Sequence, residues 1–582
     1  MKQQAKHVII WAFLLPYLAV GRGGVPAVQA KTHPIHSIQV TACDSGKVMA
    51  HIVSLLEQRI KERSGITIDR EGHGQLDLRL EVKPGIGAEG FVISGGADQA
   101  IAIVGNDYRG LLYGVGKFLR TSGYLDGSFV PSAWRGTAVP EKSTRGIYFA
   151  THFYNYYQTA PIAEVQRYIE DLALWGMNTL MVWFDMHHFN GIADPEAKAL
   201  LDRLKSYMET AKDLGLDIGF ITIGNEGYAN SPEALRAIPG GGRGGYYPSA
   251  VCPNKPGGLA YIRTIIGEFI DEVSYLDPTY ICIWPYDQGG CGGECCQPWG
   301  SNGFMKCAEA ISAMAKEKVP GIQTIFSTWY FDKQEWEAVK AKFAGHGDWV
   351  DLLLAEHVPG YHDVLEDQAV PFPVVAFPEI SMHATFPWGG FGATPLPRRI
   401  KQKWDTVKDK LDGGFPYSEG IFEDISKVVS LQLYWDGHAA LDTVLAEYMA
   451  YEFSPDAVAP LLDVVRTLEQ NHRFRWWPGK LEGVKLQLDW FPSKNAPNQE
   501  DPGAEAAYRA MKQVDASLPE WAKTGWRWRI LYIRAMLDAE LKRNGGIPNV
   551  ACLSGFNELL HIYHVTPKTD PVVSPPIPRQ IE

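Results

Sequence analysis

Carboxylate side chains follow several short apolar segments in the middle of the chain, and this arrangement suggests acid–base chemistry. The acids are Asp185, Glu226, Asp287, Asp332, Glu356, Glu379, Glu419, Glu423 and Asp424. Cleavage of a glycosidic bond needs one protonated carboxyl at the leaving oxygen and one ionised carboxylate for the water or the sugar. Acids at such places also cap helices or pair with arginines. The hypothesis of a paired-carboxylate hydrolase therefore rests on the set of acids.

Tryptophans accompany these acids. Trp183, Trp284, Trp329 and Trp388 lie at or near the ends of the same segments, in a chain with 18 Trp and 26 Tyr. Flat aromatic rings suit sugar-binding clefts, although Trp183 and Trp284 also fit a buried core. The combination of acids and rings favours an oligosaccharide or a glycoside as the ligand.

The sequence carries no signature of a cofactor-dependent reaction. It contains no G-x-S-x-G elbow, P-loop or H-E-x-x-H motif, so we expect neither a cofactor nor a catalytic metal. His187 and His188 could ligate a metal with Asp185, but adjacent residues at a strand end point to opposite sides. We therefore expect one histidine, assigned as His187, to bind substrate and the other to pack.

Residues 143–437 alternate short apolar strands with longer amphipathic helices, which predicts parallel strands with crossover helices. An α/β fold with a (β/α)₈ TIM barrel accommodates eight such units and gathers the strand-end acids at one rim. A doubly wound open sheet is the alternative, but residues 149–157, after the first strand, lack the glycine-rich turn it would need. The predicted strands are Gly146–Ala150, Thr179–Phe184, Asp217–Ile223, Tyr280–Trp284, Gln323–Ser327, Trp349–Leu354, Val374–Phe377 and Gly420–Phe422.

Other parts of the chain flank this barrel. Residues 31–142 read as a small accessory α/β domain, and residues 438–566 as an all-helical domain. Residues 1–30 combine Lys2 and Lys6, an apolar run and a Val-Gln-Ala ending, which predicts a signal peptide and a secreted or periplasmic protein. The run is too short to span a bilayer, so we expect no membrane span in the mature chain. Residues 567–582 form a proline-rich tail expected to lack fixed structure.

The charge of the chain argues against a nucleic-acid partner. Lys and Arg number 55 against 67 Asp and Glu, which gives a formal net charge of −12. Binding to phosphates needs a basic face, and no long Lys/Arg run supplies one. A hydrophobic content of 46% is typical of a globular protein that can bury large cores.

Four of the eight cysteines, Cys291, Cys295, Cys296 and Cys307, fall within seventeen residues. In an exported protein we expect them to form local disulfides that brace a loop. A metal site is the alternative, including a metal-dependent enzyme that uses Cys291, Cys295, Cys296 and an acid, although C-x₃-C-C is not a standard zinc pattern.

Three segments carry a resemblance to glycoside hydrolases. "AIAIVGNDYRGLLYGVGKFLR" (100–120) resembles the accessory domain that precedes the barrel in bacterial hexosaminidases and α-glucuronidases. With "YSEGIFED" (417–424) and "VLAEYMAYEFSPDA" (444–457), the domain order resembles the α-glucuronidase group. This resemblance implies an exo-acting, inverting enzyme with Asp287 as general acid and Glu356 and Glu379 as the base pair. The acid of that group is a glutamate, whereas this chain has the shorter aspartate.

A second resemblance, through Arg145-Gly146, is to the exo-β-N-acetylhexosaminidases, whose arginine holds sugar hydroxyls. That family has an Asp-Glu pair after the fourth strand, and this chain has Asp287-Gln288. Glutamine is not a proton donor of the needed acidity, so either the acid has moved, for example to Glu294, or the substrate-assisted mechanism is absent. Arg145 could equally be a structural plug of the barrel. A non-catalytic carbohydrate-binding protein is a further alternative.

The remaining assignments concern substrate binding. We expect the residues that contact the sugar to be Arg145, Asp185, His187, Glu226, Trp284, Trp329, Trp388 and Glu423.

Overall fold

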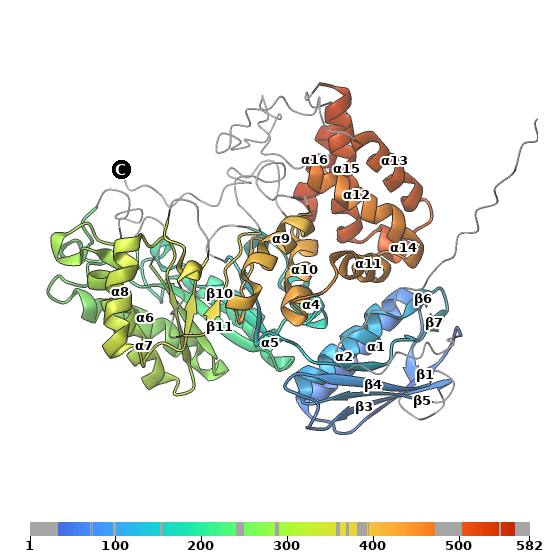
Figure 1. Cartoon of the computed structure of the whole chain (residues 1–582), viewed down its shortest axis with the longest axis horizontal. Helices are drawn as coiled ribbons and strands as arrows, with labels where there is room; N and C mark the ends of the chain where they lie inside the picture. The colour runs from blue at the N-terminus through green and yellow to red at the C-terminus, as the bar shows by residue number, and fades with distance from the viewer. Residues whose placement is uncertain are drawn as a thin grey trace, which may run out of the picture.

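The computed structural model describes residues 33–69, 72, 74–96, 100–151, 155–239, 249–285, 290–356, 361–367, 372–380, 393, 395–471, 503–545 and 549–564. The predicted signal peptide and proline-rich tail lie outside these residues, as do Asp287 and Trp388. Within the described part, no helix is long and apolar enough to cross a membrane. The chain forms a mixed sheet with two helices, a parallel barrel surrounded by helices, and a cluster of helices (Figure 1).

The amino-terminal elements form a six-stranded sheet in the order β2-β1-β3-β5-β4-β8. Alternate residues of β3, such as Leu76, Leu78 and Leu80, are fully buried, as expected for strands covered on one face. Helices α1 and α2 provide the cover, and α2 starts where Asp107 accepts a hydrogen bond from the Gly110 amide (2.8 Å). The bounds are β1 (Ile38–Ala42), α1 (Lys47–Ser64), β2 (Ile68–Asp69), β3 (Leu76–Val82), β4 (Phe91–Gly96), β5 (Ala100–Gly105), α2 (Tyr108–Arg120), β6 (Gly123–Leu125), β7 (Ser128–Val130) and β8 (Gly136–Ala138).

The central strands run parallel, each beside the next in sequence, and the sheet closes on itself. Closure comes through the bridges Ala376–Gly414 and Glu379–Tyr417. The predicted (β/α)₈ barrel is thus confirmed. Its strands are β9 (Thr144–Phe149), β10 (Thr179–Trp183), β11 (Asp217–Ile223), β12 (Tyr280–Trp284), β13 (Gln323–Ser327), β14 (Leu352–Leu354), β15 (Val374–Val375), β16 (Gly413–Gly414) and β17 (Tyr417–Ser418).

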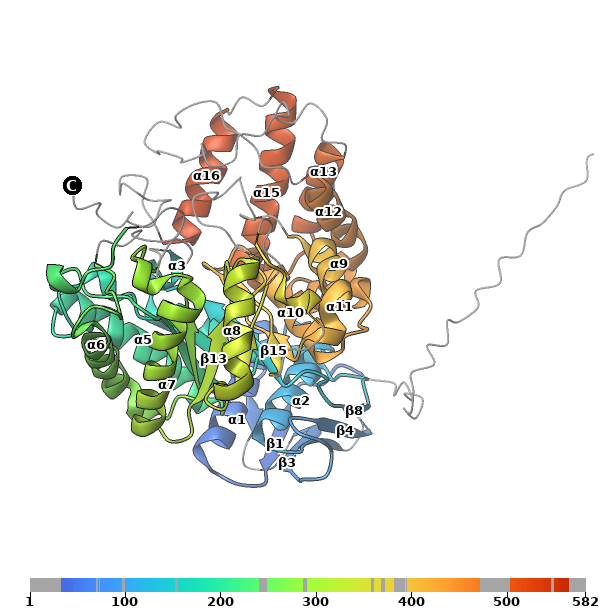
Figure 2. The same ribbon diagram turned by 60° about the vertical axis from the view of Figure 1, so that its left-hand side comes forward.

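Helices cover the outside of the barrel (Figure 2). In α5 the buried residues Ala197, Leu201, Leu204 and Met208 recur at helical spacing and give it one apolar face. The barrel helices are α3 (Tyr156–Thr159), α4 (Ile162–Leu174), α5 (Pro195–Asp213), α6 (Gly258–Val273), α7 (Met305–Lys318), α8 (Lys333–His346), α9 (Pro397–Val407) and α10 (Asp424–Trp435).

The eighth strand differs from the prediction. We expected it over Gly420–Phe422, but the pairing with β9 is made by β16 and β17, and the predicted segment is a turn before α10. Ile421 and Phe422 are buried apolar residues and so resemble a strand in sequence. The backbone there is instead held by the Glu423 carboxylate, which accepts hydrogen bonds from the amides of Glu419 (2.9 Å) and Gly420 (3.0 Å).

Arg145 lies at the amino-terminal end of β9, where the accessory domain meets the barrel. Its buried guanidinium donates to the carbonyl oxygen of Gly176 (2.9 Å) and pairs with Glu89 of the accessory domain. The guanidinium also lies over the rings of Tyr113 and Trp435, 5.2 Å from each centroid. The assignment of Arg145 to sugar binding is therefore wrong, because this end of the barrel is opposite the carboxyl-terminal rim. The structural alternative holds.

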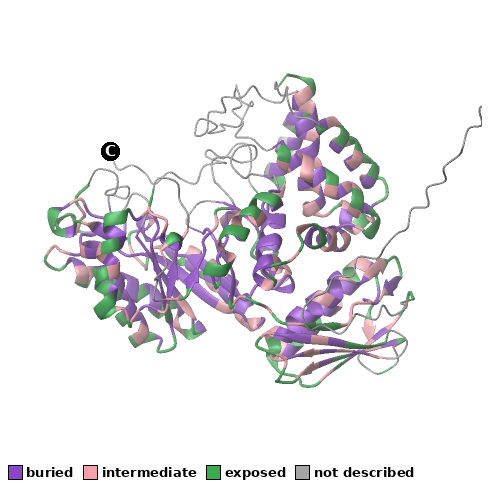
Figure 3. Ribbon diagram, viewed as in Figure 1, coloured by how far each residue is buried: buried purple, intermediate pink, exposed green. Residues whose placement is uncertain are grey.

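The carboxyl-terminal helices carry buried faces (Figure 3), whose apolar residues belong to one core cluster with those of the helices around the barrel. Arg527 joins the two parts, because its guanidinium binds Asp424 (2.8 Å) and Asp171 (3.1 Å) of the barrel. The hydroxyl of Tyr563 donates to the Glu419 carbonyl (2.6 Å), so the last helix reaches the rim of the barrel. The helices are α11 (Leu441–Glu452), α12 (Val458–Gln470), α13 (Ala504–Asp515), α14 (Glu520–Lys523), α15 (Trp526–Arg543) and α16 (Val550–Ile562).

Candidate active site

Four polar side chains converge at the carboxyl-terminal ends of β10 and β11. His187 Nδ1 lies 2.5 Å from Asp185 Oδ1 and 2.9 Å from Glu226 Oε1, and His188 Nε2 lies 2.9 Å from Asp185 Oδ2. Trp183 Nε1 donates to the other oxygen of Glu226 (3.4 Å). Asp185, His187 and Glu226 are buried, so this rim cluster of Asp185, His187, His188 and Glu226 is fixed by its internal hydrogen bonds.

The two histidines do not point to opposite sides, which corrects the prediction. Met186–His188 form a single 3₁₀ turn after β10, and the two imidazole centroids lie 4.1 Å apart. A 3₁₀ turn places neighbouring side chains about 120° apart, whereas a strand alternates them by about 180°. Both rings can therefore reach Asp185.

Burial and mutual attraction oppose each other in this cluster. Burial alone would raise the pKa of the Asp185 carboxyl, but His187 and His188 hold it well below its usual range. Burial alone would lower the pKa of His187, but Asp185 and Glu226 raise it to about 9. Burial raises the pKa of Glu226, against the opposing effect of His187. The cluster thus keeps a protonated imidazole beside an ionised aspartate at neutral pH.

This imidazolium makes the stability of the protein depend on pH. The folded-state pKa of His187 lies above its ordinary value, so the stabilisation is complete below about pH 6.5 and is lost as the pH rises through about 9. We expect the wild-type Tm to fall across this window and the His187→Gln variant to fall less. Calorimetry of both proteins over the same pH series checks this, and parallel curves would contradict it.

Aromatic rings fill the barrel mouth beside the rim cluster. The Trp284 centroid lies 5.2 Å from Trp329 and 4.7 Å from Phe377, and Phe377 lies 5.4 Å from Tyr148. All four side chains are more than nine-tenths buried. They therefore form a rigid floor, in which Trp284 and Trp329 are as much core as contact surface.

A stack of rings leads from this floor toward the surface. Tyr330 lies 5.0 Å from Trp329 at 13°, and Tyr361 lies 4.2 Å from Tyr330 at 2°. Tyr361 is exposed, and Tyr330 holds a left-handed backbone with φ of 56°. A non-glycine residue in this region is strained and persists only where its surroundings require it.

Glu379 follows β15 and is exposed, unlike the acids of the rim cluster. Its backbone pairs with Tyr417, whose ring belongs to the barrel interior, and its charge helps raise the pKa of the Tyr417 phenol, after burial and Glu419. The Tyr417 hydroxyl donates to Glu419 (2.6 Å). Glu379 and Glu419 therefore approach the same tyrosine at the carboxyl-terminal end of the barrel.

Glu356 follows β14, and both of its carboxylate oxygens have partners. One oxygen accepts a hydrogen bond from the Phe377 amide (3.1 Å), and the other pairs with Lys403 of α9. Glu356, Glu379, Arg399 and Lys403 line one cavity between the end of β15 and helices α9 and α10. The structure thus brings the two predicted base carboxylates to one cavity, with two basic residues beside them.

Glu423 is not available to a substrate, which corrects its assignment. Its side chain is buried, and in addition to the two backbone amides it accepts a hydrogen bond from Ser418 (2.8 Å). Lys427, also fully buried, lies 3.6 Å away as its counterion. Desolvation raises the pKa of Glu423 and lowers that of Lys427 to about 8. This pair holds the turn between β17 and α10.

The loop with the expected acid, Asp287-Gln288, lies outside the described residues, and so does Trp388. Glu294, the other candidate acid, is exposed in the 3₁₀ turn Glu294–Cys296. Among the strand-end acids, Asp332 caps α8 by accepting a hydrogen bond from the Glu335 amide (2.7 Å). Asp424 accepts hydrogen bonds from buried tyrosine hydroxyls, so both are structural.

Sequence reasoning missed the rings of Tyr148, Tyr330, Tyr361, Phe377 and Tyr417. All of them lie at strand ends or in the loops that follow, as the tryptophans do, and this position was the available signal.

In the described part of the chain, two groups have the spacing of metal ligands: Asp185, His187 and His188, and Cys252, Cys291 and Cys296. In the first group the carboxylate already pairs with both imidazoles.

The fold and the rim define a class: the chain has the architecture of multidomain TIM-barrel glycoside hydrolases. A GH115 4-O-methyl-α-glucuronidase with specificity for decorated arabinogalactans superimposes with a TM-score of 0.61 at 12% identity, over 93% of this chain and 78% of that one. A GH138 enzyme targeting pectin rhamnogalacturonan II gives 0.55 at 11%, over 90% and 73%. A Streptomyces plicatus β-hexosaminidase gives 0.50 at 15%, over 74% and 96%.

These similarities concern the fold. No family model matches the chain. No curated protein matches it either. The resemblance found in the sequence is confirmed at this level, because the matched structures include both an α-glucuronidase and a hexosaminidase.

Proposed function

We propose that the protein is a glycoside hydrolase that acts on a glycoside or oligosaccharide. The observation that carries this proposal is the rim cluster beside an aromatic floor at the carboxyl-terminal mouth of the barrel. Enzymes with this fold hold their substrates at that mouth. A saccharide needs hydrogen-bonding partners for its hydroxyls and flat apolar surface for its ring faces, and this mouth offers both.

The roles follow from exposure and pairing. Asp287, after β12, is the general acid, and Glu379 is the general base, because this exposed residue lines the same cavity as Glu356. Glu356 pairs with Lys403 and accepts a hydrogen bond from the Phe377 amide, and it thereby positions these groups beside Glu379. Asp185, His187 and Glu226 bind hydroxyls of the sugar. The stack ending in exposed Tyr361 provides a platform for the leaving group.

The reaction is exo-acting and inverting, and the sugar is a uronic acid. Arg399 and Lys403 support a uronate, because they lie in the cavity with Glu356 and Glu379. Inversion requires a water between acid and base, with the carboxyls about 6.5–9.5 Å apart, whereas retention requires about 5–5.5 Å. The signal-like residues 1–30 support export to the periplasm or the medium. Intact-mass analysis of the secreted protein, with the first residue expected near Lys31, tests this.

A screen of glycosides tests the substrate class. The set varies the anomer and the substituent independently: α- and β-glucuronides, N-acetylglucosaminides and neutral glucosides, as nitrophenyl glycosides and as short oligosaccharides with a terminal uronate. We expect release of the α-linked uronate and, by proton NMR, β-configured first product. Release of N-acetylglucosamine instead would support a hexosaminidase. The structural similarity to the Streptomyces plicatus β-hexosaminidase favours this alternative, and Gln288 in place of an acid disfavours it. Calorimetric binding without any product would support a lectin-like protein.

A further inference from the structure

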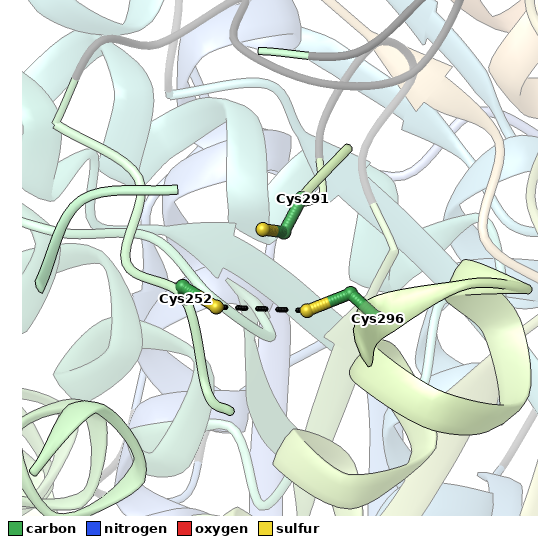
Figure 4. Close-up of side chains that lie close together, drawn as sticks. All are labelled: Cys252, Cys291 and Cys296. Atoms are coloured by element: carbon green, nitrogen blue, oxygen red, sulfur yellow. Dashed lines mark hydrogen bonds between the residues drawn. The ribbon is translucent and has the colours of Figure 1, made fainter. Parts of the chain in front are cut away.

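Three cysteine sulfurs meet between two loops of the barrel rim (Figure 4). Cys252 precedes α6, whereas Cys291 and Cys296 belong to the loop after β12. Their Sγ atoms all lie within 4.8 Å of one another, and Cys252 Sγ is 3.5 Å from Cys296 Sγ. No disulfide joins any of the eight cysteines, which are all described. The local disulfides expected from the sequence are therefore absent.

The spacing of the sulfurs matches metal ligands. In a tetrahedral site with Zn–S bonds of about 2.3 Å, the sulfurs stand about 3.8 Å apart, whereas a disulfide needs about 2 Å. We propose that Cys252, Cys291 and Cys296 bind a zinc ion that joins the loops after β11 and β12. This site is independent of the proposed reaction, since its role is structural.

The surroundings fit thiolate ligands. The Ile238 amide donates to Cys291 Sγ (3.4 Å), and the Asn254 side-chain amide donates to Cys296 Sγ (3.3 Å). Donors aimed at sulfur stabilise the charged form that binds metal. The three side chains are at most 1% exposed, which excludes competing ligands from the solvent. Cys295, exposed and with Sγ 3.9 Å from that of Cys296, is a neighbouring thiol for the fourth position.

The cysteine site lies between two loops that the protein also connects by other contacts. Asn225, next to Glu226 of the rim cluster, donates to the carbonyls of Val251 (3.1 Å) and Gly290 (3.2 Å), so it links the same two loops. Asp287 precedes Cys291 by four residues. A zinc ion here would add a further link between the same two loops that Asn225 joins.

Elemental analysis of the purified full-length chain tests the proposal. We expect one zinc per chain in wild type, and loss of that zinc in Cys252→Ser and Cys296→Ser. The matched control is Cys43→Ser, at an exposed cysteine of the accessory domain, which should keep its zinc. Equal zinc in Cys252→Ser and wild type would overturn the proposal.

Two measurements on the wild type avoid dependence on variants that fail to fold. After zinc removal and loading with CoCl₂, a thiolate site should give sulfur-to-cobalt charge-transfer absorption. Alkylation under denaturing conditions with EDTA, followed by peptide mass spectrometry, should label Cys252, Cys291 and Cys296. A disulfide between Cys252 and either partner, or the absence of both zinc and the cobalt signal, would overturn the proposal. Because none of these readouts uses substrate, they stand whether or not the proposed glycosidase activity is found.

Discussion

Replacing Glu379 with glutamine should lower kcat on the best glycoside by about 10²–10⁴-fold, the usual contribution of a general base. Glutamine keeps the size of the side chain but cannot accept a proton from water. Glu379 is exposed at the end of β15, and glutamine preserves the shape of the side chain, so the fold should be unchanged. Initial rates with circular dichroism of the same preparation measure both effects.

Variants of two further carboxylates distinguish a catalytic role of Glu379 from the general effect of removing an acid in this region. Glu366→Gln is the matched control, because Glu366 is another exposed acid of the loop between β14 and β15, and kcat should stay within a factor of two or so of wild type. Glu356→Gln removes the partner of Lys403, so a lower Tm should accompany its loss of rate. Activity of Glu379→Gln equal to that of Glu366→Gln would rule out Glu379 as the base.

Replacing Lys427 with methionine should destabilise the fold by about 3–5 kcal/mol, because it leaves the Glu423 carboxylate buried without its counterion. The same change removes the hydrogen bond to Ser418 (2.7 Å) and the cation above the Tyr168 ring, 4.6 Å from its centroid. Urea unfolding followed by tryptophan fluorescence measures the change in the free energy of unfolding.

A surface pair and a double variant test the cause. Lys318→Met removes an ion pair between α7 and α6 in which Asp271 is largely exposed, and should cost about 0–1 kcal/mol. The double variant Lys427→Met with Glu423→Gln should recover part of the loss, since it removes the unpaired charge. If Lys427→Met costs no more than Lys318→Met, the buried pair does not stabilise this turn.

Most of the barrel was predictable because its signal is local. Three predicted strands, Asp217–Ile223, Tyr280–Trp284 and Gln323–Ser327, match the observed bounds, since continuous apolar runs are typical of strands covered on both faces. The eighth strand was misplaced because β16 and β17 have only two residues each. Several glycines and a proline lie in or next to them, and these residues are not typical of strands. Their pairing with β9, rather than their composition, makes them strands.

The candidate site was predictable in part for the same reason. In a parallel barrel any polar residue that follows a strand lies at the carboxyl-terminal rim, which was enough to propose Asp185 and Glu226. It was not enough to separate roles. Glu423 turned inward to bind backbone amides, and Arg145 bound Glu89 of another domain. Arg145 depends on a partner far away in the sequence, whereas Glu423 depends on a turn that brings nearby amides to its carboxylate and that composition does not specify.

Residue order and periodicity alone determined that this chain would build parallel strands with crossover helices and a ring of acids and aromatic residues. The three-dimensional packing decided which acids are neutralised, which remain exposed, and that Cys252 meets Cys291 and Cys296 across a gap in the sequence. The physical reason is that local pattern sets which residues face inward or follow a strand. Charge state, exposure and ligand geometry instead depend on neighbours that only the closure of the barrel and the docking of its domains bring within a few ångströms.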